Sequence, residues 1–312
     1  MSQQADATML GDVQSLVRAH CPRKSTRTAV DFLTLYRSET TTDPLLVVYE
    51  PRLYIIIQGA KRIRIHKSSF DYDQNHYLVA TVDLPLSGHI TRATPEAPYL
   101  AACIAFTPEE IASVIAETRA DPGLRSPLHT SLGLSAVTPD LLDALRRLLI
   151  ALGNDDDLTF LAPMLKREII YRALQGDQRH VLHEIADQKS DASRINRALA
   201  HMRAHFMEET EASTLPGLAG MGRSTFYRKF QEVTGLSPVQ YRKRLRLQEA
   251  RRLMLYENRL AADAGFAVGY ESPSQFTREY RSIFGMPPHQ DVSRIRAIGI
   301  ERYRELNEAV WV

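Results

Sequence analysis

The spacing of hydrophobic positions changes partway along the chain. Between about Thr28 and Phe106, short runs rich in β-branched and aromatic residues are separated by turn residues such as Pro51 and Gly88. In 62–65, arginine and isoleucine alternate, so one face of that strand is expected to meet water. Many short strands without helical spacers predict an antiparallel sandwich or barrel. The runs are 45–49, 53–57, 62–65, 77–82 and 100–106.

A helical period follows from Thr107 onward. Thr107-Pro-Glu-Glu110 has the form of a capping box with proline at the first helical position. Thr138 opens a second helix, in which leucines recur at spacings of four, three and four from Leu141 to Leu152. This stripe can pack on the β-rich region or form a dimer interface, and the sequence leaves both open.

One fifteen-residue pattern occurs twice in the all-helical last third, fifty residues apart. In each copy the aromatic and branched residues share one face of a helix, and the serine and arginine positions fall roughly opposite. The pattern therefore predicts two short helices that each bury one face and present a polar one. The matching pairs are Ser224/Ser274, Phe226/Phe276, Arg228/Arg278, Gly235/Gly285 and Pro238/Pro288.

A short helical segment and a tight glycine-containing turn precede each copy, over 215–221 and 260–268. A helix, a tight turn and a second helix with an exposed polar face form the helix-turn-helix pattern. The stretch 237–256 predicts a long basic helix that spaces the two motifs. Its cationic residues are expected to point mostly outward; they are Arg242, Lys243, Arg244 and Arg246.

The two copies are encoded unequally. Ser272 and Gln275 predict a capping box at the start of the second helix. The first motif has Pro216, Gly217 and Gly222 at positions where helix formers or a capping side chain are expected. We therefore expect the first motif to have the looser frame.

Charge is distributed unevenly. Residues 1–188 carry 19 Lys and Arg against 23 Asp and Glu, a net charge of −4, whereas residues 189–312 carry 20 against 14, a net charge of +6. A basic C-terminal third suits a polyanion-binding module attached to an acidic body. Cys21 and Cys103 are too few for a disulfide framework, which fits a reducing cytoplasm, and a redox role for either stays open. No transmembrane run or signal peptide is recognisable.

The C-terminal third resembles the AraC/XylS family of transcription regulators. The residues that carry this resemblance are Gly269 to Tyr280, Phe284-Gly285, Pro287-Pro288, Ala219-Gly-Met221, Phe230 to Pro238 and Arg246 to Arg251. The N-terminal half is similar to the cupin-like sensor domain of one AraC branch, through Leu35-Tyr-Arg, Val48 to Pro51, Gln58 to Lys61 and Asp83 to Leu86. The resemblance implies an α+β multidomain chain: an N-terminal antiparallel β-barrel (cupin-like), a helical linker region, and a C-terminal all-α domain of seven helices with two helix-turn-helix motifs.

The expected domains are an N-terminal tail (1–25), the sensor (26–137), a helical linker and dimerisation region (138–190), the DNA-binding domain (191–290) and a C-terminal tail (291–312). By position, the resemblance carries DNA-recognition roles to four residues in each repeat, because both recognition helices of the family enter successive major grooves. These residues are Arg223, Ser224, Thr225 and Arg228 in the first repeat, and Ser274, Gln275, Thr277 and Arg278 in the second.

The expected function is that of a cytoplasmic, sequence-specific regulator that binds double-stranded DNA as a homodimer, and not that of an enzyme. Its β domain is expected to sense a small molecule. Tyr36, Tyr54, Gln58, Lys61 and Tyr77 lie near strands, but the sequence assigns no ligand site. His66, His76 and His89 are scattered, without a His-x-His pair, so neither a metal site nor a cofactor is predicted. Two alternatives stay open: a cupin-type enzyme fused to a DNA-binding domain, and a ligand-independent architectural DNA-binding protein.

Overall fold

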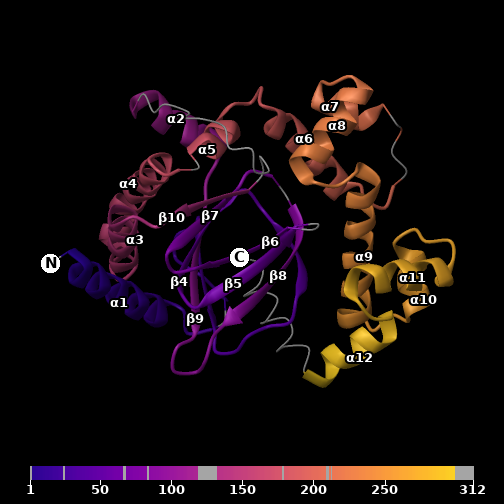
Figure 1. The fold of residues 1–312 in the computed structure, drawn as a ribbon, viewed down its shortest axis with the longest axis horizontal. Coiled ribbons are helices and arrows are strands. Elements are labelled where there is room, and N and C mark those ends of the chain that lie inside the picture. Colours follow the sequence, from indigo (N-terminus) through magenta and orange to yellow (C-terminus); the bar gives the residue numbers. More distant parts are fainter. Residues whose placement is uncertain are drawn as a thin grey trace.

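The N-terminal half of the chain forms two antiparallel β-sheets that face each other (Figure 1). The structure is a computed structural model that describes residues 2–23, 25–65, 68–82, 84–118, 132–177, 179–208, 211 and 213–298. The strands are β1 (Ser25–Arg27), β2 (Leu33–Ser38), β3 (Leu45–Tyr49), β4 (Arg52–Gln58), β5 (Ala60–Ile65), β6 (Ser68–Asp73), β7 (His76–Ala80), β8 (Leu84–Arg92), β9 (Tyr99–Ala105) and β10 (Leu132–Ala136). Within these residues, one sheet has the order β1-β2-β9-β4-β7-β10 and the other β3-β8-β5-β6.

The larger sheet is buried on both faces, which explains its continuous apolar runs. Along β4, Leu53 and Ile55 pack under helices, whereas Tyr54 and Ile56 face the second sheet. Successive side chains of a strand point to opposite faces, so a strand covered on both sides needs apolar residues at every position. The predicted wet face of 62–65 is confirmed at Arg64, which is exposed.

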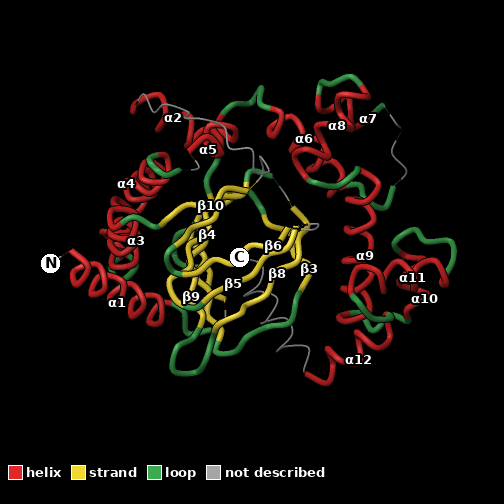
Figure 2. Tube along the Cα trace, viewed as in Figure 1, coloured by secondary structure: helices red, strands yellow, loops and turns green. Residues whose placement is uncertain are grey.

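Helices cover the outer face of the larger sheet (Figure 2). They are α1 (Ser2–His20), α2 (Pro108–Thr118), α3 (Pro139–Ala151), α4 (Asp155–Leu174) and α5 (Arg179–Ala186). The predicted helix starts are confirmed. Thr107 and Glu110 exchange both capping-box hydrogen bonds, and Thr138 caps α3.

The assignment of residues 1–25 to a tail was wrong. Helix α1 occupies most of this segment, and its Val13 and Val17 are fully buried with the leucines of α3. The leucine stripe is also internal, since Leu145 and Leu148 are fully buried in the same cluster. Of the two readings that the sequence left open, packing within the chain is therefore the one that the structure supports.

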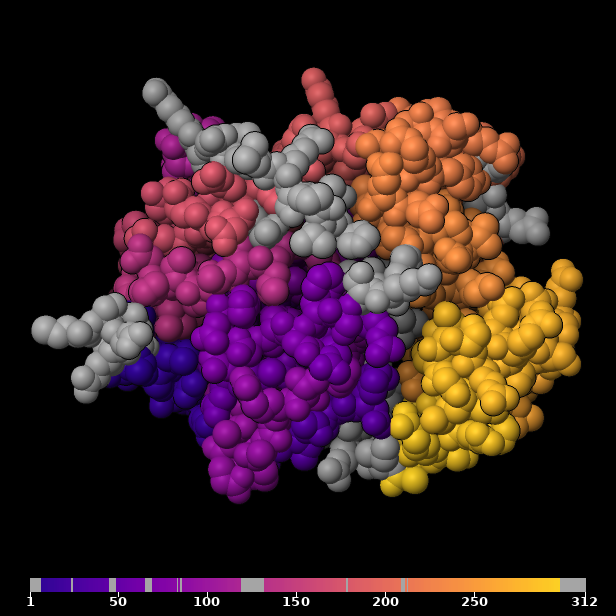
Figure 3. All heavy atoms as spheres, viewed as in Figure 1, coloured from indigo at the N-terminus to yellow at the C-terminus, as the bar shows by residue number. Residues whose placement is uncertain are grey.

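The C-terminal helices form a lobe beside the β-sheets (Figure 3). They are α6 (Asp191–Ala204), α7 (Thr214–Ala219), α8 (Arg223–Thr234), α9 (Pro238–Tyr256), α10 (Ala261–Ala267), α11 (Pro273–Phe284) and α12 (Pro288–Ile298). Helix α9 runs between the α7–α8 pair and the α10–α11 pair, as the spacer prediction required (Figure 1). The predicted C-terminal tail is helical up to Ile298, and Asp291 and Ile295 are fully buried. The rest of that tail lies outside the described residues.

The predicted fold class is confirmed, with one refinement. Within the part of the chain that the structure describes, the strands form two packed sheets and are not hydrogen-bonded into one closed barrel. The arrangement is that of a cupin-like β sandwich followed by an all-helical region. No helix among the described residues is long and apolar enough to span a membrane.

The space between the two sheets is rich in tyrosine. Of the five side chains considered from the sequence, three lie there: Tyr36, Tyr54 and Lys61. The other two do not. The hydroxyl of Tyr77 donates to the carbonyl of Ala173 on the helical side, at 3.2 Å, and Gln58 accepts from Arg18 of α1. Tyr49, Tyr72 and Tyr99 complete the buried cluster around Cys103.

Neither cysteine has the environment of a reactive thiol. Both are buried, and burial raises the pKa of Cys103 to about 12 and also raises that of Cys21. Since the thiolate is the reactive form, these raised pKa values argue against a redox-sensing role.

Lys61 is the one fully buried lysine among the described residues, and its amine contacts the tyrosine cluster. The Nζ atom lies 4.9 Å from the ring centroid of Tyr49, and burial lowers the pKa of Lys61 to about 7. The unfolded chain has the ordinary lysine pKa of about 10.4. Between these two values the unfolded state binds one more proton than the folded state, so the free energy of unfolding increases with pH.

We predict that Lys61→Met removes this increase. The slope that Lys61 contributes is at most about 1.4 kcal/mol per pH unit between pH ~7 and ~10. Chemical denaturation of both proteins at pH 7 and pH 9 measures it, with Lys189→Met at an exposed lysine as the control. If Lys61→Met and the parent gain the same stability over this interval, Lys61 does not titrate as described.

Candidate DNA interface

The predicted helix-turn-helix motif occurs twice. Helices α8 and α11 have 12 residues each, and each ends at a glycine in the left-handed conformation, Gly235 at φ +68° and Gly285 at φ +82°. In front of them, α7 and α10 end near Gly220 at φ +59° and Gly269 at φ +85°. Glycine adopts this conformation without the steric penalty of a Cβ atom, so both turns and both helix ends are encoded locally.

Aromatic side chains fix the inner face of each recognition helix. Phe226 and Phe230 of α8 are fully buried with ring centroids 5.5 Å apart, and Phe276 and Tyr280 of α11 are fully buried at 5.6 Å. Glycine at 265 lets α10 approach α11 closely, since a Cβ there would lie 3.0 Å from the Phe276 ring. Burial of the aromatic stripe was predicted for both copies and is confirmed.

The opposite face of each helix meets solvent. All eight side chains with predicted recognition roles are exposed, and four come from each helix. Their exposure is what contact with DNA requires, and their roles stay predictions. They are Arg223, Ser224, Thr225, Arg228, Ser274, Gln275, Thr277 and Arg278.

The two central arginines have different surroundings. Arg228 Nη1 lies 2.7 Å from Oε1 of Glu232, which is also 3.0 Å from Lys229 through its other oxygen. Ser282 occupies the position of Glu232 in the second repeat, and Arg278 has no ion pair within the residues that the structure describes. The second arginine is therefore the one whose side chain can reach a partner without breaking an ion pair within the described residues.

The helix starts also differ. Ser272 accepts a hydrogen bond from the backbone N–H of Gln275 at 3.4 Å, whereas Gly222 offers no capping side chain. The capping box predicted at Ser272 is half realised, because the Gln275 side chain donates to Glu279 instead. A complete capping box is found at the start of α9, between Ser237 and Gln240.

Two arginines hold the turns of the motifs, which the sequence did not reveal. Arg246 of α9 was expected to point outward, but it donates to the carbonyls of Phe206, Met207 and Gly269 at 3.0, 3.2 and 3.3 Å. Arg194 of α6 donates to the carbonyl of Ala219 at 2.8 Å and to that of the next residue. The sequence contains only one indication of these roles: the last carbonyls of a helix have no partner within the helix and need hydrogen-bond donors from elsewhere.

A buried acid supports the second recognition helix from below. Asp291 of α12 is fully buried; its Oδ2 atom accepts from the Tyr280 hydroxyl at 2.7 Å and lies 2.7 Å from Arg251 Nε. Phe230 stands at the position of Tyr280 in the first repeat and has no hydroxyl. This anchor belongs to a segment that the sequence analysis assigned to a tail.

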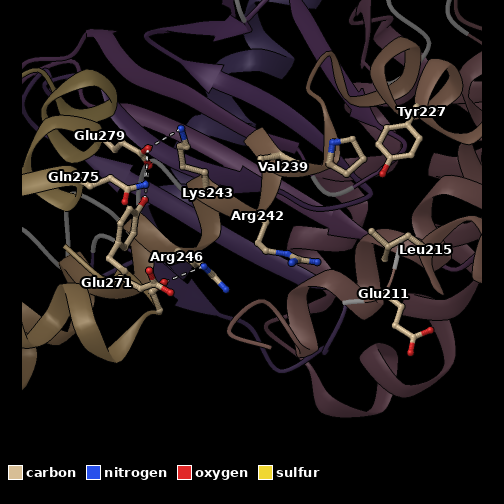
Figure 4. Close-up of a pocket in the computed structure, with 13 residues that line it drawn as sticks. Glu211, Leu215, Tyr227, Val239, Arg242, Lys243, Arg246, Glu271, Gln275 and Glu279 are labelled. Carbon is tan, nitrogen blue, oxygen red and sulfur yellow. Dashed lines mark hydrogen bonds and ion pairs between the residues drawn. The ribbon is translucent and has the colours of Figure 1, made fainter. Parts of the chain in front are cut away.

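A groove of about 610 Å³ separates the two motifs. Helix α9 forms its floor, and Tyr227 of α8 and Gln275 of α11 reach it from opposite sides (Figure 4). Its charged lining is balanced, with three cations and three carboxylates: Arg242, Lys243, Arg246, Glu211, Glu271 and Glu279. The surplus positive charge of this region therefore lies outside the groove.

Comparison with known proteins gives a consistent result in both halves of the chain. Residues 29–181 match the AraC-type transcriptional regulator N-terminus, and residues 217–294 match a helix-turn-helix domain. The HTH-type transcriptional activator RhaS of Escherichia coli (strain SMS-3-5) is 26% identical over 153 residues, which are 49% of this chain and 54% of RhaS. The chain thus spans about half the length of the curated relatives it matches.

Solved structures of ToxT from Vibrio cholerae share the fold. A 1.65 Å structure of ToxT superposes with a TM-score of 0.54 at 12% identity, covering 83% of this chain and 97% of ToxT. Unsaturated fatty acid bound ToxT from strain SCE256 gives a TM-score of 0.52 at 11% identity, covering 86% and 97%. The paired matches in sequence, the repeated helix-turn-helix motif and the shared architecture show that the chain belongs to the AraC family of transcription regulators.

Proposed function

We propose that the protein is a sequence-specific transcription regulator that places α8 and α11 in successive major grooves of double-stranded DNA. The observation that carries this proposal is the duplicated helix with a fixed aromatic inner face and an exposed polar outer face. Arginine can bond guanine O6 and N7, and glutamine can bond adenine N6 and N7. Some of the arginines contact phosphates and position the protein instead.

The proposed functions are assigned to the predicted domains, and two of these domains are each extended by one helix. Residues 26–137 form the sensor, and α1 completes its core; residues 138–190 form the helical linker. Residues 191–290 form the DNA-binding domain, and α12 completes its core through Asp291. A regulator of genomic DNA must act where that DNA lies, and the cytoplasm is the proposed compartment, as in the sequence analysis.

The space between the sheets is the proposed effector site. The hydroxyl of the fully buried Tyr99 has no hydrogen-bond partner among the described residues. A buried polar group without a partner costs about 1–3 kcal/mol, which an oxygen-bearing ligand could recover. ToxT has been solved with an unsaturated fatty acid, so that class of compound is the first to test. Contact between sensor and DNA-binding region is provided by Asp43 and Arg294, 2.7 Å apart.

We infer a homodimer that uses α3 and α4, but not the leucine stripe. Large apolar side chains are exposed on these two helices, with Ile150 of α3 at 51% and Phe160 and Met164 of α4 at 70% and 55% exposure, whereas Leu145 is fully buried. Exposed apolar surface of this kind is typical of protein–protein contacts. A second copy of the chain is the proposed occupant, because operators read by such motifs commonly match a twofold-symmetric protein.

Arg278→Ala is expected to weaken specific binding by about 1–3 kcal/mol, with discrimination lost at one base position. Electrophoretic or fluorescence titrations with duplexes varied at each position measure this. Arg252→Ala, which removes the same charge from a side chain paired with Glu249 and Glu257, is the matched control. A uniform loss on all sequences with a shallower salt dependence would reassign Arg278 to a phosphate. An unchanged affinity for every duplex would remove it from the interface.

Phe160→Glu is expected to convert the dimer to a monomer without unfolding it, since the side chain is exposed in the single chain. Sedimentation velocity measures the change. Phe266→Glu, at an exposed phenylalanine of α10 outside this face, is the control that leaves the mass unchanged. Leu145→Glu should instead unfold the region. A Phe160→Glu protein that stays dimeric would exclude this face.

An unsaturated fatty acid is expected to raise the melting temperature of the protein, because a ligand that binds only the folded state stabilises it. Tyr99→Phe, which removes only the hydroxyl, should reduce the increase. No increase with any acid tested would reject this ligand class.

The two alternative functions have their own tests. No response to any small molecule would favour the architectural alternative, and metal analysis of the purified protein tests the fused-enzyme alternative.

A further inference from the structure

Glu279 joins three parts of the second motif. Its Oε2 accepts a hydrogen bond from the hydroxyl of Tyr270 at 2.9 Å, and its Oε1 lies 3.2 Å from Nζ of Lys243. The same Oε1 accepts from Nε2 of Gln275 at 3.4 Å (Figure 4). These partners come from the turn after α10, from α9, and from the preceding turn of α11 itself.

In all three contacts Glu279 is the hydrogen-bond acceptor. A carboxylate has no donor, so only the NH₂ end of the Gln275 amide can face Glu279. Burial tends to raise the pKa of Glu279, but hydrogen bonds from Tyr270, Lys243 and Gln275 outweigh it and hold that pKa below its usual range. Glu279 is therefore a charged acceptor at neutral pH. One N–H and the carbonyl oxygen of the Gln275 amide are left for other partners.

We propose that Glu279 is a positioning residue that sets which end of the Gln275 amide faces DNA, and so makes Gln275 selective for adenine. Adenine presents an acceptor at N7 and a donor at N6 in the major groove, which matches one N–H and one carbonyl oxygen. If the amide turned over, its NH₂ end would meet the wrong group on the base. The inference rests on the proposed role of Gln275 in recognition.

The first repeat provides the comparison. Lys229 stands where Glu279 does, and Thr225 where Gln275 does. Lys229 is tied to the scaffold by an ion pair with Asp191 of α6 at 2.8 Å. In both repeats the side chain at this position, Lys229 or Glu279, is bound to a neighbouring helix. In the second repeat, Glu279 also contacts Gln275, a side chain predicted to read a base.

The test uses the full-length protein and a randomised DNA duplex library, from which bound sequences are selected and counted. Glu279→Gln keeps the shape but offers both a donor and an acceptor, so it no longer dictates the amide orientation. We expect the adenine preference at one position to fall by about five-fold or more, with affinity for non-specific DNA unchanged within about two-fold. Lys229→Met, the matched loss of an anchor in the first repeat, should leave that preference intact.

Three outcomes overturn the inference or separate it from the proposed function. If Gln275→Ala abolishes the preference and Glu279→Gln retains it, Glu279 does not position Gln275, while the proposed function stands. If Gln275→Ala changes no base preference, Gln275 reads no base and the inference fails with it. Failure of the parent protein to select any sequence would reject the proposed function itself. Should Glu279→Gln fail to fold, Tyr270→Phe replaces it in the test. This variant removes one hydrogen bond that holds Glu279, so the adenine preference at the same base position must fall.

Discussion

Burial of one face of a short helix is the constraint on which the candidate interface depends. Phe226 and Phe230 under α8, and Phe276 and Tyr280 under α11, occupy the core and fix the rotation of each helix about its axis. With 3.6 residues per turn, the residues between these positions must point the other way. The buried aromatic residues therefore determine that the polar side chains of both repeats face solvent, although the polar side chains make no contact in the core.

The two repeats share this constraint but differ in what surrounds it. Helix α11 is held below by the buried Asp291 and at its side by the contacts of its Glu279 with Tyr270 and Lys243, and its first turn is capped by Ser272. The first is held through Lys229 and starts at the side-chain-free Gly222. This asymmetry agrees in direction with the looser first motif expected from the sequence, which stays a prediction.

The larger sheet of the β-rich half is buried on both faces, and the candidate effector site lies on the inner one. Helices cover the outer face, and the tyrosines and Lys61 lie on the inner one. A physical connection to the DNA-binding region runs from Asp43 to Arg294, which lies 3.9 Å from the Asp291 carboxylate beneath Tyr280. A shift of Asp43 in the β-rich half would therefore act on Arg294, next to the Asp291 anchor of α11.

The sequence by itself determined five of the described strands (β3, β4, β5, β7 and β9), the caps at Thr107 and Thr138, and the exposed face of each repeat. These features depend on neighbours within a few positions, which a single sequence contains. Tertiary structure alone decided that Ser2–His20 form a helix packed through Val13 and Val17, and that Leu145 faces the interior. It also decided the partners of Arg246 and Glu279. A long side chain bonds whichever group packing brings within about 3 Å. The partners of Arg246 lie 23 to 40 positions away, and Lys243, one partner of Glu279, lies on another helix.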